Sequence, residues 1–126
     1  MSEYTKVLVA VDLSDESGVV IERALGICSA GAEVHLAYVQ EPMEAVYMGV
    51  VPYGPVFVGM DQVEARLHKE LQTKLESWGE AHGIAADRTH FLNGSPAREL
   101  HRFADEQGVE LIVLGTHGQK GVQLLL

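Results

Sequence analysis

The chain has 126 residues, of which 47% are hydrophobic and 21% are charged. This length and composition are typical of one globular domain and exclude a disordered or fibrous chain. The net charge of −9, from 18 acidic and 9 basic residues, excludes the basic surface that unaided nucleic-acid binding needs. Its single cysteine, Cys28, excludes an internal disulfide and a cysteine-based zinc site.

The first half of the chain predicts a strand, a helix and a second strand. Residues 6–11 are a continuous apolar run, which is typical of a strand buried on both faces of a parallel sheet. Asp15 and Glu16 are then placed for the positive end of a helix that we expect to end at Gly31. Residues 33–39 are the second predicted strand. The apolar stripe of the helix falls on Val20, Ile21, Ala24, Leu25 and Cys28.

The second half predicts two helices and two more strands. A more polar strand over residues 88–92 is expected at a sheet edge. Ser95 as N-cap and Pro96 at the first helical position begin the last helix, which ends at Gly108. Residues 111–115 are a second fully apolar strand. The longer helix before these elements carries an apolar stripe of Val63, Leu67, Leu71, Leu75 and Trp78.

This alternation of strands and helices predicts an α/β fold, with a doubly wound parallel sheet between layers of helices. We expect residues 1–126 to form one domain. Residues 121–126 end in three leucines without a predicted partner. We therefore expect the chain to be incomplete at its C-terminus, and a tail that packs on a partner is the alternative.

No segment indicates membrane insertion, so we expect a cytoplasmic protein. The first six residues lead into the apolar strand without the basic and hydrophobic regions of a signal peptide. The weakly charged stretch 45–60 is interrupted by Pro52, Pro55 and three glycines, which excludes a transmembrane helix.

Two predicted loops follow the two apolar strands, where ligands bind in open α/β sheets. The first loop, residues 12–14, offers the Asp12 carboxylate and the Ser14 hydroxyl but no glycine. Asp15 and Glu16 follow directly, so this turn repels phosphate, because two unit charges 4 Å apart interact by about 4 kcal/mol near a surface. The loop suits the hydroxyl groups of a sugar.

The second loop, residues 115–121, has glycines that allow positive φ angles, close approach of the backbone and an anion-binding nest. Lys120 adds a positive charge, and Thr116 and His117 add hydrogen-bond donors. Neither the dinucleotide glycine fingerprint nor a Walker A sequence is present. A plain turn explains the glycines equally well, but their pairing with Asp12 predicts a nucleoside phosphate. The glycines recur at every third position: Gly115, Gly118 and Gly121.

At these two loops the sequence resembles the universal stress protein family. Residues 9–14, Val-Ala-Val-Asp-Leu-Ser, resemble its first strand and aspartate, and residues 115–121 resemble the first half of its glycine signature. The resemblance covers the whole chain and implies a Rossmann-like three-layer α/β/α fold with strand order 3-2-1-4-5. It also implies a homodimer. The family's second glycine pair, following helix and fifth strand would come after Leu126 and are missing.

In one branch of the family the resemblance implies ATP binding, with Mg²⁺ arriving only with the nucleotide; ADP or AMP is left open. Asp12 would bind ribose or adenine, and Val39 would offer backbone groups to the adenine. Gly115 and Gly118 would hold the phosphates beside His117. The implied nucleotide-binding residues are Ala10, Val11, Asp12, Leu13, Ser14, Val39, Leu114, Gly115, Thr116, His117, Gly118 and Gly121.

We expect a stress-response or regulatory protein, a homodimer or higher homo-oligomer, that uses ATP as a signal. Fast phosphoryl transfer needs a base, charge compensation and organised metal ligands, and the glycine loop offers one lysine and one histidine. Two alternatives stay open. One is a slow ATP hydrolase that uses His117, and the other is a dimeric adaptor that binds a protein partner and no nucleotide.

Three further features of the sequence are a long connection, the spacing of the histidines and the single cysteine. Residues 40–60 form a connection far longer than the usual length of about 2–6 residues. We interpret it as a mobile cover or a flap that contacts a partner, with a disordered insertion as the alternative. No histidine pair has the i, i+4 spacing of a helical zinc site. Cys28 is interpreted as a small buried hydrophobe.

Overall fold

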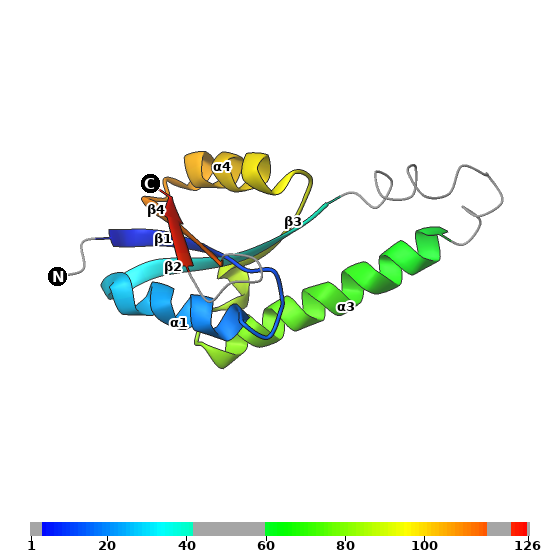
Figure 1. Ribbon diagram of the computed structural model, residues 1–126, viewed down its shortest axis with the longest axis horizontal. Coiled ribbons are helices and arrows are strands. Elements are labelled where there is room, and N and C mark those ends of the chain that lie inside the picture. The colour runs from blue at the N-terminus through cyan, green and yellow to red at the C-terminus, as the bar shows by residue number, and fades with distance from the viewer. Residues whose placement is uncertain (1–3, 42–59, 116–121, 126) are drawn as a thin grey trace.

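The computed structural model describes residues 4–41, 60–115 and 122–125 of the chain. Its elements form a layered α/β structure (Figure 1). In chain order they are β1 (Tyr4–Ala10), α1 (Ser17–Ile27), β2 (Cys28–Gln40), α3 (Met60–Ala81), the short 3-10 helix η2 (Ala86–Arg88), β3 (Thr89–Asn93), α4 (Pro96–Gln107), β4 (Leu111–Gly115) and β5 (Val122–Leu125).

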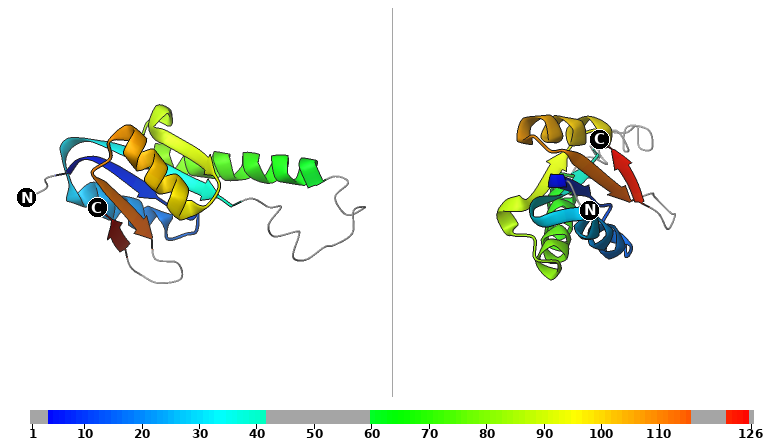
Figure 2. Two further views of the ribbon diagram at one scale, coloured as in Figure 1. Left: turned by 90° about the horizontal axis from the view of Figure 1, so that it is seen from above. Right: turned by 90° about the vertical axis from the view of Figure 1, so that its left-hand side faces the viewer.

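The strands form one sheet in the order β3-β2-β1-β4-β5. The first four strands run parallel, and β5 runs antiparallel to β4. Helix α4 covers one face of the sheet, while α1 and α3 cover the other (Figures 1 and 2). The predicted doubly wound fold and its strand order 3-2-1-4 are therefore confirmed.

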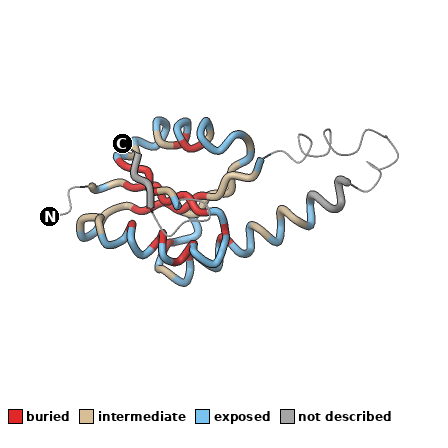
Figure 3. Tube along the Cα trace, in the orientation of Figure 1, coloured by how far each residue is buried: buried red, intermediate tan, exposed pale blue. Residues whose placement is uncertain are grey.

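Residues 7–10 of β1 and 111–113 of β4 are covered on both faces of the sheet, which explains why all of them are apolar (Figure 3). On one face, Val9 packs in a cluster with Ile21 of α1 and Leu75 of α3. On the other face, Leu8 packs in a second cluster with Phe103 of α4. Burying one such side chain contributes about 1.5–3 kcal/mol.

The last helix and the third strand lie where the sequence predicts them. Strand β3 is at the edge of the sheet, in agreement with its more polar sequence. Helix α4 begins with Pro96 after the N-cap residue Ser95. It ends at Gly108, whose φ of 71° is the left-handed conformation that glycine adopts at low cost.

The end of α1 differs from the prediction. The helix stops at Ile27 rather than at Gly31, and Cys28 already pairs with Tyr4 of β1. The pairing register then shifts before Glu33, and Gly31 supplies a positive φ of 80° within this irregular stretch. Leu25 was predicted in the buried stripe, but it is 38% exposed because it lies at the margin of the buried face.

Strand β5 was not predicted, because residues 121–126 were interpreted as the end of an incomplete chain, with a tail that packs on a partner as the alternative. In the structure, residues 122–125 pair with β4 at the edge of the sheet. A parallel strand would need a crossover of about a dozen residues or more, and only residues 116–121 separate the two strands. The chain therefore returns antiparallel. None of the described helices combines the length and apolar composition that a membrane crossing needs.

Candidate functional site

A cavity of about 430 Å³ opens at the carboxyl edge of the sheet. It lies where the strand order reverses, since β1 is flanked by β2 on one side and β4 on the other. This is the position at which open α/β sheets bind ligands. Its lining residues are Ala10, Val11 and Asp12 at the end of β1, Tyr38, Val39 and Glu41 at the end of β2, Pro96 and Leu100 of α4, and Leu114 and Gly115 of β4.

The structure brings together predicted site residues from three separate strands. Asp12, Val39 and Gly115 all line the cavity, with Ala10, Val11 and Leu114 beside them. Two predicted residues, Leu13 and Ser14, are not among the lining residues. The predicted residues Thr116, His117, Gly118 and Gly121, and residues 42–59 of the predicted cover (residues 40–60), lie outside the described residues.

Asp12 is held by a turn that links β1 to α1. The backbone N–H of Ser14 donates a hydrogen bond of 2.9 Å to Asp12 Oδ1, and the N–H of Glu16 donates to Ser14 Oγ at 3.3 Å. These side-chain-to-backbone bonds are typical of turns that begin with aspartate or serine. They fix the Asp12 carboxylate at the rim of the cavity.

Leu13 lies in this turn in a left-handed conformation, with φ at 63°. Its side chain is only 3% exposed and packs in the cluster beneath α1 and α3. Such a conformation costs about 1–3 kcal/mol for a residue other than glycine. Burial of the leucine offsets this cost, so Leu13 anchors the turn in the core instead of contacting the cavity.

Tyr38 and Glu41 are cavity residues that the sequence analysis missed. Burial raises the pKa of the Tyr38 phenol, and the negative charges of Asp12 and Glu41 raise it further. Both carboxylates therefore act on this part of the cavity. None of the described residues that line it is basic. The signal for Glu41 was its place directly after β2, at the same sheet edge as Asp12.

Gly115 corrects one expectation about the glycine loop. We expected glycine at these positions because it allows positive φ angles and a close approach between the backbone and a ligand. Gly115 does not have a positive φ, and a Cβ atom there would lie 2.8 Å from Val20 Cγ2 of α1. Packing between β4 and α1 is therefore enough to require glycine at this position.

Cys28 and those histidines that the structure describes form no metal site. Cys28 is half-buried, its thiol donates to the Ala24 carbonyl oxygen at 3.0 Å, and burial raises its pKa, which favours the unreactive thiol. Within residues 4–41, 60–115 and 122–125, no group of three or more His, Cys, Asp or Glu residues is arranged to hold a metal ion.

Comparisons with known proteins agree with this architecture. The universal stress protein family model matches residues 3–126. Universal stress protein A homolog 1 of Coxiella burnetii is 29% identical over 124 residues, which cover 98% of this chain and 83% of that protein. Universal stress protein YxiE of Bacillus subtilis is 31% identical over 129 residues, which cover 98% of this chain and 86% of YxiE.

Solved structures show the same fold. Hypothetical protein MJ0577 matches with a TM-score of 0.68 at 18% identity, over 94% of this chain and 80% of that one. Protein Rv1636 from Mycobacterium tuberculosis matches with a TM-score of 0.59 at 25% identity, over 96% of this chain and 78% of that one. Together with the family match over residues 3–126, these likenesses show that the chain belongs to the universal stress protein family.

Proposed function

We propose that the cavity binds an adenine nucleotide, ATP or its diphosphate or monophosphate, and that the chain is a cytoplasmic stress-response regulator that uses this nucleotide as a signal. One observation carries the proposal. Asp12, Val39 and Gly115, which the sequence singled out at three distant positions, line a single cavity at the switch point of the sheet.

The charges around the cavity favour one orientation of the nucleotide. The Asp12 carboxylate accepts hydrogen bonds from sugar hydroxyls or from an adenine amino group, and the Glu41 carboxylate adds a second negative charge to the lining. The same carboxylates repel phosphate, by about 4 kcal/mol for two unit charges 4 Å apart near a surface. The nucleoside therefore lies towards the ends of β1 and β2, and the phosphates lie towards the end of β4.

The pairing of β4 with β5 supports a phosphate-binding role for the segment between them. Gly115, which lines the cavity, pairs with Val122 across the two strands. The chain therefore leaves the sheet and re-enters it at the same edge, beside the cavity. Residues 116–121 include Lys120 and two glycines, which suit an anion. Their role as the phosphate cradle is part of the proposal.

The position of β5 supports the homodimer. β5 is an edge strand of the described sheet, so its outer backbone N–H and C=O groups are available for pairing. A second copy of β5 would extend the sheet across a two-fold axis, as isologous dimers do. We therefore include a homodimer through this edge in the proposed function.

Calorimetric titration with ATP, ADP and AMP tests the proposal. Asp12→Asn is the informative variant, because its amide oxygen still accepts from Ser14 N–H while its charge is lost. We expect at least a tenfold loss of affinity, since a hydrogen bond to a charged group contributes about 1.5–3 kcal/mol. Asp15→Asn, which changes a carboxylate outside the cavity lining, is the matched control.

Two results would contradict the proposal. If the folded wild-type chain binds none of the three nucleotides at millimolar concentration, the adaptor without a nucleotide replaces it. If Asp12→Asn and Asp15→Asn weaken binding equally, the nucleotide does not occupy this cavity. Release of phosphate from bound ATP, measured in the same samples, decides whether slow hydrolysis accompanies binding.

A further inference from the structure

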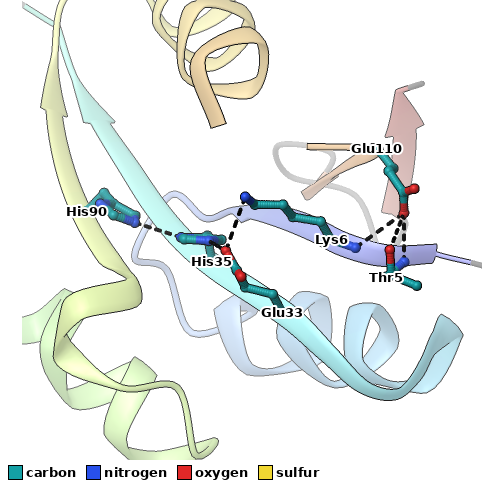
Figure 4. Close-up of polar contacts among 6 residues, drawn as sticks. All are labelled: Thr5, Lys6, Glu33, His35, His90 and Glu110. Atoms are coloured by element: carbon teal, nitrogen blue, oxygen red, sulfur yellow. Dashed lines mark hydrogen bonds and ion pairs between the residues drawn. The ribbon is translucent and has the colours of Figure 1, made fainter. Parts of the chain in front are cut away.

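A second polar cluster lies partly buried on the α4 side of the sheet, and none of its residues lines the cavity (Figure 4). His35 of β2 is 5% exposed, and its Nδ1 atom lies 2.9 Å from His90 Nε2 of β3. On its other side, His35 Nε2 lies 2.5 Å from Glu33 Oε2. Lys6 Nζ of β1 is 3.4 Å from the same carboxylate oxygen.

Parallel pairing of β2 with β3 creates the contact between the two histidines. His90 is in register with Ala37, which lies two residues beyond His35 on the same face of the sheet. The two ring planes are inclined by 25°, with their centroids 5.1 Å apart, so the rings meet edge to edge through His35 Nδ1 and His90 Nε2. Phe103 of α4 covers both of them, with its centroid 5.6 Å from that of His35 and 4.5 Å from that of His90.

The hydrogen-bond geometry limits how many protons the pair can hold. The Glu33 carboxylate accepts, so His35 Nε2 carries a hydrogen and donates. A single hydrogen then lies between His35 Nδ1 and His90 Nε2, whichever nitrogen carries it. One added proton on His90 Nδ1 preserves that bond. A second added proton puts hydrogens on both facing nitrogens, so neither can accept and the hydrogen bond is lost. Both rings are then positively charged and repel each other.

The groups around the histidine pair shift the pKa values of Glu33 and His90. Hydrogen bonding from His35, and then from Lys6, lowers the pKa of Glu33, which therefore stays ionised beside His35. Burial lowers the pKa of His90, as does the charge of His35, and Asp87 of η2 opposes both effects. α4 presents the Phe103 ring to the pair.

The charged side chains on α4 near Phe103 are engaged with one another. Arg102 Nη2 is 2.6 Å from Glu99 Oε1, and Arg102 Nη1 is 3.1 Å from Glu106 Oε1. These ion pairs leave α4 without a carboxylate hydrogen-bonded to either histidine in the described contacts. A second positive charge on the pair is therefore not compensated from the α4 side.

We propose that His35 and His90 form a pH-dependent switch beneath α4. The pair keeps its hydrogen bond when it holds one added proton, whereas a second added proton separates the rings and loosens the packing of Phe103 against them. α4 also supplies Pro96 and Leu100 to the lining of the cavity. Acidification therefore weakens ligand binding through α4, and this second step rests on the proposed function. β3 is an edge strand, so His90 can move outward without displacing another strand.

Hydrogen exchange of the α4 amides between pH 7.5 and pH 5.0, corrected for intrinsic rates, tests the switch. We expect the protection of the amides around Phe103 to fall about tenfold or more in the wild type. A proton that binds the open form with a pKa one unit higher than in the closed form changes the balance between the two forms by this factor. His90→Gln keeps a donor where Nε2 lies but does not titrate, and its protection should change less than about threefold. His101→Gln, on the exposed face of α4, is the matched control and should follow the wild type.

ATP affinity, measured by calorimetry on the same three proteins, tests the coupling. Wild type and His101→Gln should lose several-fold more affinity than His90→Gln over this pH range. Protonation of the nucleotide phosphates near pH 6 affects all three proteins equally. If no protein binds ATP at pH 7.5, the proposed function fails, and the exchange data still decide the switch.

Three results would overturn the inference. Protection of α4 that is equal at both pH values removes the switch, as does an equal loss in His90→Gln and wild type. If ATP affinity falls equally in all three proteins, the coupling to the cavity is absent. Should His90→Gln not fold, nuclear magnetic resonance of the wild-type imidazoles decides. Full protonation of both rings with unchanged α4 protection then contradicts the proposal.

Discussion

The backbone of Gly115 lies so close to Val20 that a Cβ atom at position 115 would be 2.8 Å from Val20 Cγ2. The end of β4 is therefore fitted directly against α1. Since Gly115 also lines the cavity, the same residue joins the core packing to the candidate site. A glycine in a signature loop does not by itself show that a ligand requires it.

Gly115→Ala should destabilise the protein by about 1–3 kcal/mol, because overpacking forces the strand or Val20 to move. Denaturant unfolding measures this loss. Gly26→Ala is the control, since Gly26 lies in α1 and its added Cβ would meet no described atom within 4 Å apart from its chain neighbours and the nearby backbone of its own helix. That variant should gain up to about 1 kcal/mol from helix propensity.

Val20→Ala combined with Gly115→Ala isolates the contact itself. The double variant should be more stable than the sum of the single effects by about 1 kcal/mol or more. A Gly115→Ala protein of wild-type stability that binds nucleotide less tightly would mean that the glycine serves the ligand alone.

Glu41→Gln should strengthen ATP binding several-fold and leave adenosine binding unchanged. The Glu41 carboxylate lines the cavity and repels the polyphosphate, and this repulsion is partly screened by salt at about 0.1 M. Titrations with ATP and adenosine at two salt concentrations measure the difference. Glu80→Gln, at an exposed position on α3, should change neither affinity. An equal loss for both ligands would instead place Glu41 in direct contact with the nucleoside.

Glu110→Gln should remove part of the acid sensitivity of folding. Glu110 Oε1 accepts from Thr5 N–H at 2.7 Å and from Lys6 N–H at 3.3 Å, and the bonds from Thr5 and Lys6 lower the pKa of Glu110 below 4.5. Ionised Glu110 therefore stabilises the fold above pH 4.5, and this contribution is lost as the pH falls through the lowered pKa.

Urea unfolding midpoints between pH 7 and pH 3 measure this dependence. At pH 7, Glu110→Gln should unfold at lower urea than the wild type, and the difference should shrink below pH 4.5. Glu80→Gln should keep the wild-type profile. A difference for Glu110→Gln that stays constant down to pH 3 would show that ionisation of Glu110 does not contribute.

Ser17→Ala should raise stability by about 1 kcal/mol. Ser17 is 1% exposed, and its Oγ atom has no hydrogen-bond partner among the described residues. An unsatisfied buried hydroxyl costs about 1–3 kcal/mol of stability, which alanine would recover. The small cavity that alanine leaves takes back part of this gain. Ser77→Ala, on exposed α3 surface, gives the gain from helix propensity alone. A loss of stability in Ser17→Ala would mean that the hydroxyl has a bound water.

The sequence predicted those parts of the fold that depend on local patterns. Continuous apolar runs identified β1 and β4 as strands buried on both faces, and Ser95, Pro96 and Gly108 marked the ends of α4. It did not predict where α1 ends, because the shift in pairing between β1 and β2 depends on tertiary contacts. β5 was missed for the same reason, since only β4 makes it a strand.

For the site, the rule that ligands bind at strand ends was enough to bring Asp12 and Gly115 together, and Val39 came from the resemblance to the universal stress protein family. The same rule, applied to every residue after a strand, would have found Glu41. The contact between His35 and His90 could not be predicted, because those residues are 55 positions apart and meet only through the register of β2 with β3.

Position 13 has two requirements that conflict: its backbone φ is positive, which favours glycine, and its side chain fills a site in the core, which favours a large apolar residue. Glycine would relax its positive φ but would empty a site in the core, whereas any other large apolar residue would fill the site and keep the unfavourable backbone. No common substitution satisfies both. Engineered versions of this cavity should therefore vary the residues around the turn and leave Leu13 in place.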